Sequence, residues 1–316
     1  MTPAPPTISS DVQYCKMDDG ARIAVRRWSG PQKQRLLISH GNGLAIEGFY
    51  DFAEALFDSF EVIAFDLRNH GSSPRDPHPE NPWPRYIADV PQIFNGVEQL
   101  YGQRETHGAF HSMAAVSTLC AQTLNPSPWA SLTLFEPPLA PSDNAAVQET
   151  FNAAQEVMSS RALRRRRTFA DPAELAASFG RAATFGGIPI RALDRLANAS
   201  LLHTDASSAE PWELVLPPEA EARNFAQATS LSQYWDALTG IKIPIQLVTG
   251  DPEVHDLPNL VAIAHHMSKT FGYPVSSIPN SNHFMQLQDA HSCAQKVKDF
   301  AARSVEYSNT INQETK

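Results

Sequence analysis

The sequence contains few cysteines and little positive charge, and each shortage excludes a class of protein. Cys15, Cys120 and Cys293 are widely separated, which argues against a disulfide framework and against a zinc site. We expect them to be buried free thiols. The chain has 25 Lys and Arg against 34 Asp and Glu, a formal net charge of -9, which opposes binding to nucleic acid or to an anionic membrane. We therefore expect a small-molecule partner.

Long apolar runs and targeting signals are also missing. No stretch approaches the ~18 apolar residues of a membrane-spanning helix. The first ten residues are rich in proline and lack the basic and apolar segments of a secretory signal. We expect a cytoplasmic protein with no membrane contact, no metal and no cofactor, and the sequence leaves the oligomeric state open.

The apolar residues that are present predict an α/β protein. They make up 42% of 316 residues, enough for one large core that carries an insertion. Short apolar strands alternate with amphipathic helices, which is typical of a mostly parallel sheet covered by helices on both faces. Strands are predicted at 12–17, 21–28, 35–39, 60–65, in a run ending at 111, and at 130–135, 244–249 and 275–278. Helices are predicted at 46–57, 86–101, from 113 onwards, and at 260–271 and 292–308, with a proline-rich loop at 74–85.

Residues 139–232 differ from the rest because they are rich in alanine and contain no convincing strand. We interpret them as an inserted helical cap between two parts of the core, 1–138 and 233–316. Four consecutive arginines, Arg164–Arg167, precede Asp171-Pro172, an N-cap residue followed by a first-turn proline. The arginines could bind an anionic substrate, but charge runs usually face water, and we favour that interpretation.

Ser112 lies where a predicted strand turns sharply into a helix. The strand ends at Phe110-His111, and the apolar helix begins at Met113. A hydroxyl on such a turn projects from the backbone beside the N–H groups that open the helix, as a nucleophile requires. Serine is also a favoured N-cap residue, so this stretch alone does not separate a nucleophile from a helix cap.

Three loops that follow predicted strands carry Ser112, then an acid, then His283. Ligands of open parallel sheets bind at the carboxyl ends of the strands, where these loops would meet. A serine hydroxyl is a weak nucleophile at neutral pH, so a histidine must take its proton and a carboxylate must orient the imidazole. The order serine, acid, histidine is that of the nucleophile-elbow hydrolases.

The sequence resembles α/β-hydrolase fold enzymes over residues 20–303. The motifs that carry the resemblance are His40-Gly41, the run from Asp66 to Ser73, His111-Ser112-Met113 and Asn282-His283-Phe284. The resemblance implies an eight-stranded sheet with a cap at 139–232, Ser112 as nucleophile and His283 as base. It also implies an oxyanion hole formed by the backbone N–H groups of Met113 and of Asn42 or Gly43.

The sequence departs from the family pattern at two points. Phe110 stands two residues before the nucleophile, where a small residue is usual. The usual aspartate after the seventh strand is replaced by Glu253. We rank Glu253 first as the catalytic acid, Glu136 at the end of the sixth strand second, and Asp256 third.

A serine at the nucleophile position argues against the dehalogenases and epoxide hydrolases of this superfamily, which use an aspartate. The function we expect is hydrolysis of a small-molecule ester, thioester or lactone through an acyl-enzyme. A carbon–carbon bond hydrolase, an acyltransferase, or a lyase or cyclase of secondary metabolism could use the same serine and histidine. A non-catalytic binding protein is a third class, and the substrate itself cannot be read from the sequence.

Overall fold

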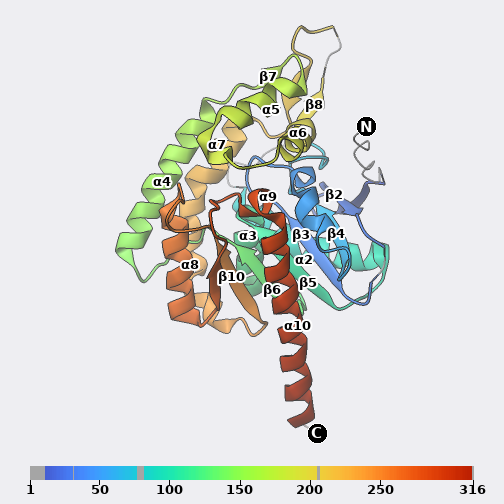
Figure 1. Ribbon diagram of the computed structural model, residues 1–316, viewed down its shortest axis with the longest axis vertical. Helices are drawn as coiled ribbons and strands as arrows, with labels where there is room; N and C mark the ends of the chain where they lie inside the picture. Colours follow the sequence, from blue (N-terminus) through green and yellow to red (C-terminus); the bar gives the residue numbers. More distant parts are fainter. Residues whose placement is uncertain (1–10, 31, 77–81, 205–206, 315–316) are drawn as a thin grey trace.

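The protein is built on an eight-stranded sheet (Figure 1). The computed structural model describes residues 11–30, 32–76, 82–204 and 207–314, so the N-terminal ten residues and part of the predicted 74–85 loop lie outside it. The strand order is β1-β2-β4-β3-β5-β6-β10-β11. The strands are β1 (Gln13–Lys16), β2 (Arg22–Arg27), β3 (Arg35–Ser39), β4 (Glu61–Phe65), β5 (Thr106–His111), β6 (Leu132–Phe135), β10 (Ile245–Thr249) and β11 (Val275–Ser277).

Strand β2 pairs antiparallel with both β1 and β4, whereas the neighbours from β4 to β11 pair in parallel. The prediction of a mostly parallel eight-stranded sheet is therefore confirmed. The core helices are η1 (Ile46–Phe49), α1 (Tyr50–Glu54), α2 (Trp83–Tyr101), α3 (Met113–Leu124), α8 (Pro258–Phe271), α9 (Met285–Gln288) and α10 (Ala290–Glu314).

Successive strand residues point to opposite faces, and this alternation gives two hydrophobic cores. Leu37 and Ile63 lie in a buried cluster with α2, α3 and α8. Their neighbours Leu36 and Val62 lie in a second cluster with α1 and α10. Because both faces of the sheet are covered, the strands read as continuous apolar runs rather than as alternating ones.

The segment between β6 and β10 contains helices, as expected, but also a small sheet that the sequence did not predict. Strands β7 (Thr168–Phe169), β9 (Trp212–Leu214) and β8 (Leu201–His203) pair antiparallel in that order. The prediction that 139–232 contains no strand was wrong, because strands of two or three residues are too short to show a period-2 pattern. The other elements are α4 (Ala145–Leu163), α5 (Pro172–Arg181), η2 (Ala183–Phe185), α6 (Ile190–Ala199), α7 (Pro218–Gln227), η3 (Ala228–Tyr234) and η4 (Asp236–Gly240). The boundaries of a cap domain at 139 and 232 stay a prediction.

The four arginines at 164–167 differ in their exposure to solvent. Arg164, Arg166 and Arg167 are exposed, as predicted for a solvated face. Arg165 is 23% exposed and forms an ion pair with Glu221 on α7. The prediction therefore fails for Arg165. Its guanidinium lies beside the loop after β3, since a Cβ atom at Gly43 would be 3.1 Å from Nη1 of Arg165.

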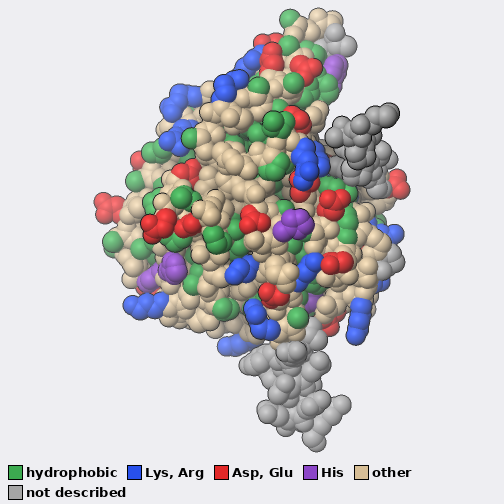
Figure 2. Space-filling model, viewed as in Figure 1, with side chains coloured by type: hydrophobic (Ala, Val, Ile, Leu, Met, Phe, Trp, Pro, Cys, Tyr) green, Lys and Arg blue, Asp and Glu red, His purple; other side chains and the backbone are tan. Residues whose placement is uncertain are grey.

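The thiols and the surface agree with the composition. Cys15, Cys120 and Cys293 are free and buried, which confirms that expectation. On the face shown in Figure 2, acidic and basic side chains are interspersed and do not form a large basic patch. Within the described part of the chain, no helix is both long and apolar enough to cross a membrane.

Candidate active site

Ser112 occupies a sharp turn between β5 and α3. Its backbone has φ 50° and ψ -111°, a conformation that non-glycine residues rarely adopt and that costs on the order of 1–3 kcal/mol. Ser112 stands at the N-cap position of α3, but its side chain makes no capping hydrogen bond. The helix-cap alternative is therefore not supported, because the strained turn does not use the hydroxyl to stabilise the helix.

Phe110 does not enter the site. Its ring is fully buried and makes edge contacts with Phe65 and Trp129, at centroid distances of 5.9 and 5.4 Å. Gly108 provides the room for the ring, since a Cβ atom there would lie 2.4 Å from Cε2 of Phe110. Residues 108 and 110 share one face of the strand, so the chain accommodates an aromatic ring near the elbow by having glycine two residues earlier.

Glu136 contacts His283 from the end of β6. Its Oε2 lies 2.6 Å from Nδ1 of His283, and the carboxylate is completely buried. The residue has φ 46°, which turns the chain sharply at the end of the strand. The other oxygen, Oε1, accepts a 2.8 Å hydrogen bond from the N–H of Gly250 and lies 2.7 Å from Nε2 of His255.

These contacts fix the ionisation of the acid. Burial by itself would raise the pKa of Glu136, but hydrogen bonds from His255 and His283 outweigh it and lower the pKa to about 2. An ionised carboxylate only accepts hydrogen bonds, so His283 donates from Nδ1. In neutral His283 the unprotonated nitrogen is therefore Nε2, the form that a general base requires.

The structure distinguishes the three candidate acids by their contact with His283. Glu253, ranked first, is exposed in the turn after β10, where its N–H is bound by Oδ1 of Asp251 at 3.0 Å. Asp256, ranked third, is 39% exposed and accepts a hydrogen bond from Thr184. Glu136 was ranked second on the sequence and is the candidate that contacts His283.

His283 also lies against the elbow. The ring of His111, the residue before Ser112, is 4.5 Å from the ring of His283, and its Nε2 lies 2.9 Å from the His283 carbonyl oxygen. Burial and the nearby charge of protonated His283 lower the pKa of His111 well below its ordinary value. A neutral His111 that donates to the carbonyl holds the His283 loop beside Ser112.

The loop after β3 passes close to the elbow. A Cβ atom at Gly41 would lie 3.0 Å from Cβ of Ser112, so any side chain there would crowd the elbow and glycine favours this approach. The N–H of Gly43 donates a 3.1 Å hydrogen bond to Nε2 of His70. Because this N–H is already hydrogen-bonded, we expect an oxyanion hole to use the N–H groups of Asn42 and Met113 rather than that of Gly43.

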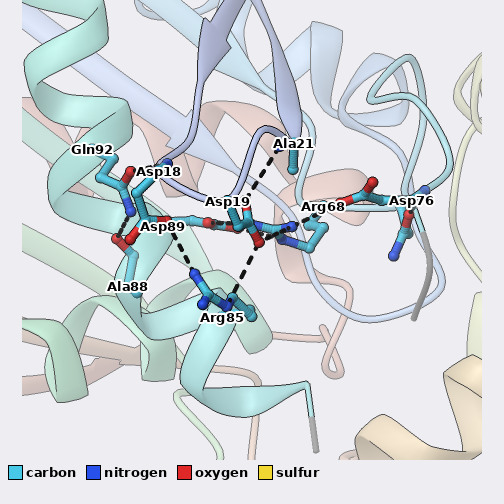
Figure 3. A network of polar contacts seen from close by, with 10 residues as sticks. Asp18, Asp19, Ala21, Arg68, Asp76, Arg85, Ala88, Asp89 and Gln92 are labelled. Atoms are coloured by element: carbon cyan, nitrogen blue, oxygen red, sulfur yellow. Dashed lines mark hydrogen bonds and ion pairs between the residues drawn. The ribbon is translucent and has the colours of Figure 1, made fainter. Parts of the chain in front are cut away.

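His70 is held by the anchored loop that follows β4. Within that loop Arg68 forms a two-bond contact with Asp89 of α2, Nε to Oδ2 at 2.9 Å and Nη2 to Oδ1 at 2.6 Å (Figure 3). Arg68 also contacts Asp19 and Asp76, so it joins the β1–β2 turn, the loop and α2. Such planar, paired contacts restrict the loop strongly. This network gives His70 a fixed position from which to hold Gly43.

Helix α7 reaches the same oxyanion loop. Nδ2 of Asn42 donates a 3.0 Å hydrogen bond to the carbonyl of Glu221, and its Oδ1 accepts a 2.8 Å bond from Nδ2 of Asn224. Both polar atoms of the Asn42 side chain thus bond to α7, which belongs to the segment inserted between β6 and β10. The backbone N–H of Asn42 is therefore the group relevant to an oxyanion.

The η2 turn of the inserted segment covers the His283 loop. Nδ2 of Asn282 donates to the carbonyl of Thr184 at 2.9 Å. Phe185 stacks on Phe284 with a centroid distance of 4.6 Å and an interplanar angle of 19°. The inserted segment thus touches loops that follow both β3 and β11, at the carboxyl ends of the parallel strands.

The sequence did not single out His70, His111, His255 or Asn224 as site residues. His70, His111 and His255 stand within motifs or loops already noted, so their positions after strands were the available signal. Asn224 carries no such signal, because its role depends on the packing of α7. Within the described ranges, no group of three or more His, Cys, Asp or Glu side chains could hold a metal ion.

Comparison with known proteins agrees with this architecture. Residues 36–296 match the model of the alpha/beta hydrolase family. No curated protein matches the sequence. Among solved structures, the chain is similar to E-2-(acetamidomethylene)succinate hydrolase, with a TM-score of 0.70 and 18% identity over 92% of this chain and 98% of that chain.

Two further structures are similar. The thioesterase domain from the curacin biosynthetic pathway has a TM-score of 0.68 and 20% identity over 91% of this chain and 98% of that one. A malate-bound esterase from Thermogutta terrifontis has a TM-score of 0.66 and 16% identity over 93% of this chain and 99% of that one. At these identities the likeness concerns the fold.

Proposed function

Because the chain belongs to the alpha/beta hydrolase family, we propose that it is a serine hydrolase that cleaves an ester, thioester or lactone of a small molecule. One observation carries the proposal: the buried carboxylate of Glu136 lies 2.6 Å from Nδ1 of His283, in a loop packed against the strained Ser112 elbow. A buried acid bonded to a histidine beside a serine has a direct chemical use in acyl transfer.

In the proposed reaction, Oγ of Ser112 attacks the substrate carbonyl carbon while Nε2 of His283 takes the hydroxyl proton. The new oxyanion is stabilised by the backbone N–H groups of Met113 and Asn42. His283 then gives the proton to the leaving oxygen or sulfur as its bond to the carbonyl carbon breaks. Water, deprotonated by the same nitrogen, then attacks the acyl-enzyme carbonyl carbon. The bond from that carbon to Oγ of Ser112 breaks, Oγ takes the proton back from His283, and the acid is released.

Glu136 has two roles in this sequence. It holds His283 in the tautomer with the proton on Nδ1, and its negative charge stabilises the imidazolium that forms during each proton transfer. Its low pKa keeps it charged at neutral pH, so the pair functions with a single mobile proton on His283.

The similar structures include a thioesterase domain and an esterase, which supports acyl chemistry as the reaction class. At identities of 16–20%, these similarities do not indicate which substrate this protein binds.

A fluorophosphonate probe tests the proposal directly, because it phosphonylates only an activated serine. We expect the wild type to be labelled and the Ser112→Ala and His283→Ala variants to remain unlabelled. Release of p-nitrophenol from a short p-nitrophenyl ester should follow the same pattern. Equal labelling of wild type and Ser112→Ala would refute the serine-hydrolase proposal.

A further inference from the structure

The Glu136 carboxylate lies between two histidines. Oε2 is 2.6 Å from Nδ1 of His283, and Oε1 is 2.7 Å from Nε2 of His255. The side chains of Glu136 and His255 are both fully buried. His255 comes from the loop between β10 and α8, whereas Glu136 directly follows β6, so two neighbouring strands of the sheet bring them together.

The tautomer of His255 follows from its second contact. The backbone N–H of Leu257 donates a 2.8 Å hydrogen bond to Nδ1 of His255. A nitrogen that accepts a hydrogen bond carries no proton, so the proton of neutral His255 is on Nε2. His255 is thus a fixed donor to Glu136.

We propose that His255 is a positioning residue, which holds the Glu136 carboxylate in the orientation and charge state that its bond to His283 requires. The proposal rests on the function proposed above. His255 does not contact the reacting atoms and acts through Glu136. Together with the N–H of Gly250, it fixes Oε1, so the carboxylate cannot rotate Oε2 away from Nδ1 of His283.

Few charged groups surround this pair. His283 faces Glu136 directly, and neutral His111 lies against the His283 ring. Oδ1 of Asp256 is 3.9 Å from Nδ1 of His255 and is 39% exposed, so its charge is partly screened by solvent. Among the titratable side chains of the β10–α8 loop, His255 therefore has the largest effect on the pKa of Glu136.

Loss of this donor has a defined effect on the pH profile. A carboxylate with one donor fewer binds protons more readily, and it also stabilises protonated His283 more strongly. Both changes make the pair take up a proton at higher pH. The acidic limb of kcat/KM should therefore move to higher pH when His255 cannot donate.

His255 also has a structural contact that must be separated from this role. A Cβ atom at Gly250 would lie 2.7 Å from Cδ2 of His255, so the ring packs closely on the loop. A smaller or apolar side chain could lower activity simply by loosening the loop. A pH shift and rescue by a side chain that can donate distinguish the two roles.

The experiment compares His255→Leu, His255→Gln and a control, His265→Leu, at an exposed histidine of α8. With p-nitrophenyl acetate, we expect kcat of His255→Leu to fall roughly tenfold to a hundredfold, with KM changed less than kcat. The midpoint of the acidic limb of its kcat/KM profile should lie roughly one pH unit higher than in the wild type. His255→Gln, whose amide can donate, should partly restore both kcat and the position of the acidic limb. The control His265→Leu should match the wild type.

A second measurement does not depend on turnover. Nitrogen-15 NMR of the imidazole rings in the wild type should show His255 neutral, with its proton on Nε2, and His283 should titrate at higher pH in His255→Leu and less so in His255→Gln. A His255 proton on Nδ1, or an unchanged His283 titration in a folded variant, would overturn the positioning role. Absence of fluorophosphonate labelling in the wild type would instead overturn the proposed function, while these NMR results would still be read for His255.

Discussion

The ring of Phe110 fills the space that a side chain at position 108 would occupy. A Cβ atom at Gly108 would lie 2.4 Å from the Phe110 ring and 2.7 Å from Leu132 of the neighbouring strand. Glycine and phenylalanine therefore form a matched pair on one face of β5. The pair lets the chain carry an aromatic residue two positions before Ser112 without moving the elbow.

Gly108→Ala should destabilise the protein by about 1–3 kcal/mol, because a methyl group would be forced into the Phe110 ring and into Leu132. The cost should be smaller in a Phe110→Leu background, where the ring has been removed. Urea unfolding of the two single variants and the double variant measures the coupling. Free energies that add without coupling would show that the two residues do not share this space.

Glu136→Gln should reduce kcat by roughly a thousandfold to ten-thousandfold, the range expected when the acid of such a triad is replaced by its amide. The amide can donate where the carboxylate accepted, so His283 would be held in the wrong tautomer. Glu253→Gln and Asp256→Asn are matched controls from the β10–α8 loop and should retain nearly full activity. Steady-state kinetics on a p-nitrophenyl ester measures these effects. A large loss of kcat in Glu253→Gln together with a normal kcat in Glu136→Gln would contradict Glu136 as the catalytic acid.

His70→Ala should lower kcat by roughly tenfold to a hundredfold with little change in KM. It removes the acceptor of the Gly43 N–H, so the loop carrying Asn42 would shift relative to Ser112. His70→Gln offers an acceptor at a similar reach and should recover part of the rate. Fluorophosphonate labelling should slow in parallel, and unchanged labelling in His70→Ala would show that His70 does not position this loop.

The pH dependence of stability should report Glu136. Its pKa in the folded protein is about 2, below the ordinary value of 4.5, so its ionised form stabilises the fold above pH 4.5. This contribution is lost as the pH falls from 4.5 towards 2, at on the order of 1 kcal/mol per pH unit. Urea unfolding between pH 6 and 3 should show a steeper decline for the wild type than for Glu136→Gln, and equal slopes would contradict the lowered pKa.

Much of the architecture was determined by local sequence patterns. Apolar runs such as Arg35–Ser39 specify buried strands because both faces of the sheet are covered, and they alternated with amphipathic helices in the order that the structure shows. The elbow at Ser112 and the loop of His283 were predictable for the same reason, since each follows a strand directly. The two- and three-residue strands β7, β8 and β9 were not, because their pairing comes from packing rather than from periodicity.

Only the tertiary structure decided which carboxylate meets His283. Strand β6 lies between β5 and β10 in the sheet, so Glu136 at its end is next to the Ser112 strand on one side and the Gly250 strand on the other. Glu253 follows the same kind of strand, but its turn directs it to solvent. In the sequence both acids follow predicted strands. Which of them is buried depends on the order of the strands in the sheet and on the turn, and neither is encoded locally. The paired histidines around Glu136 depend on that same neighbourhood, which no local pattern contains.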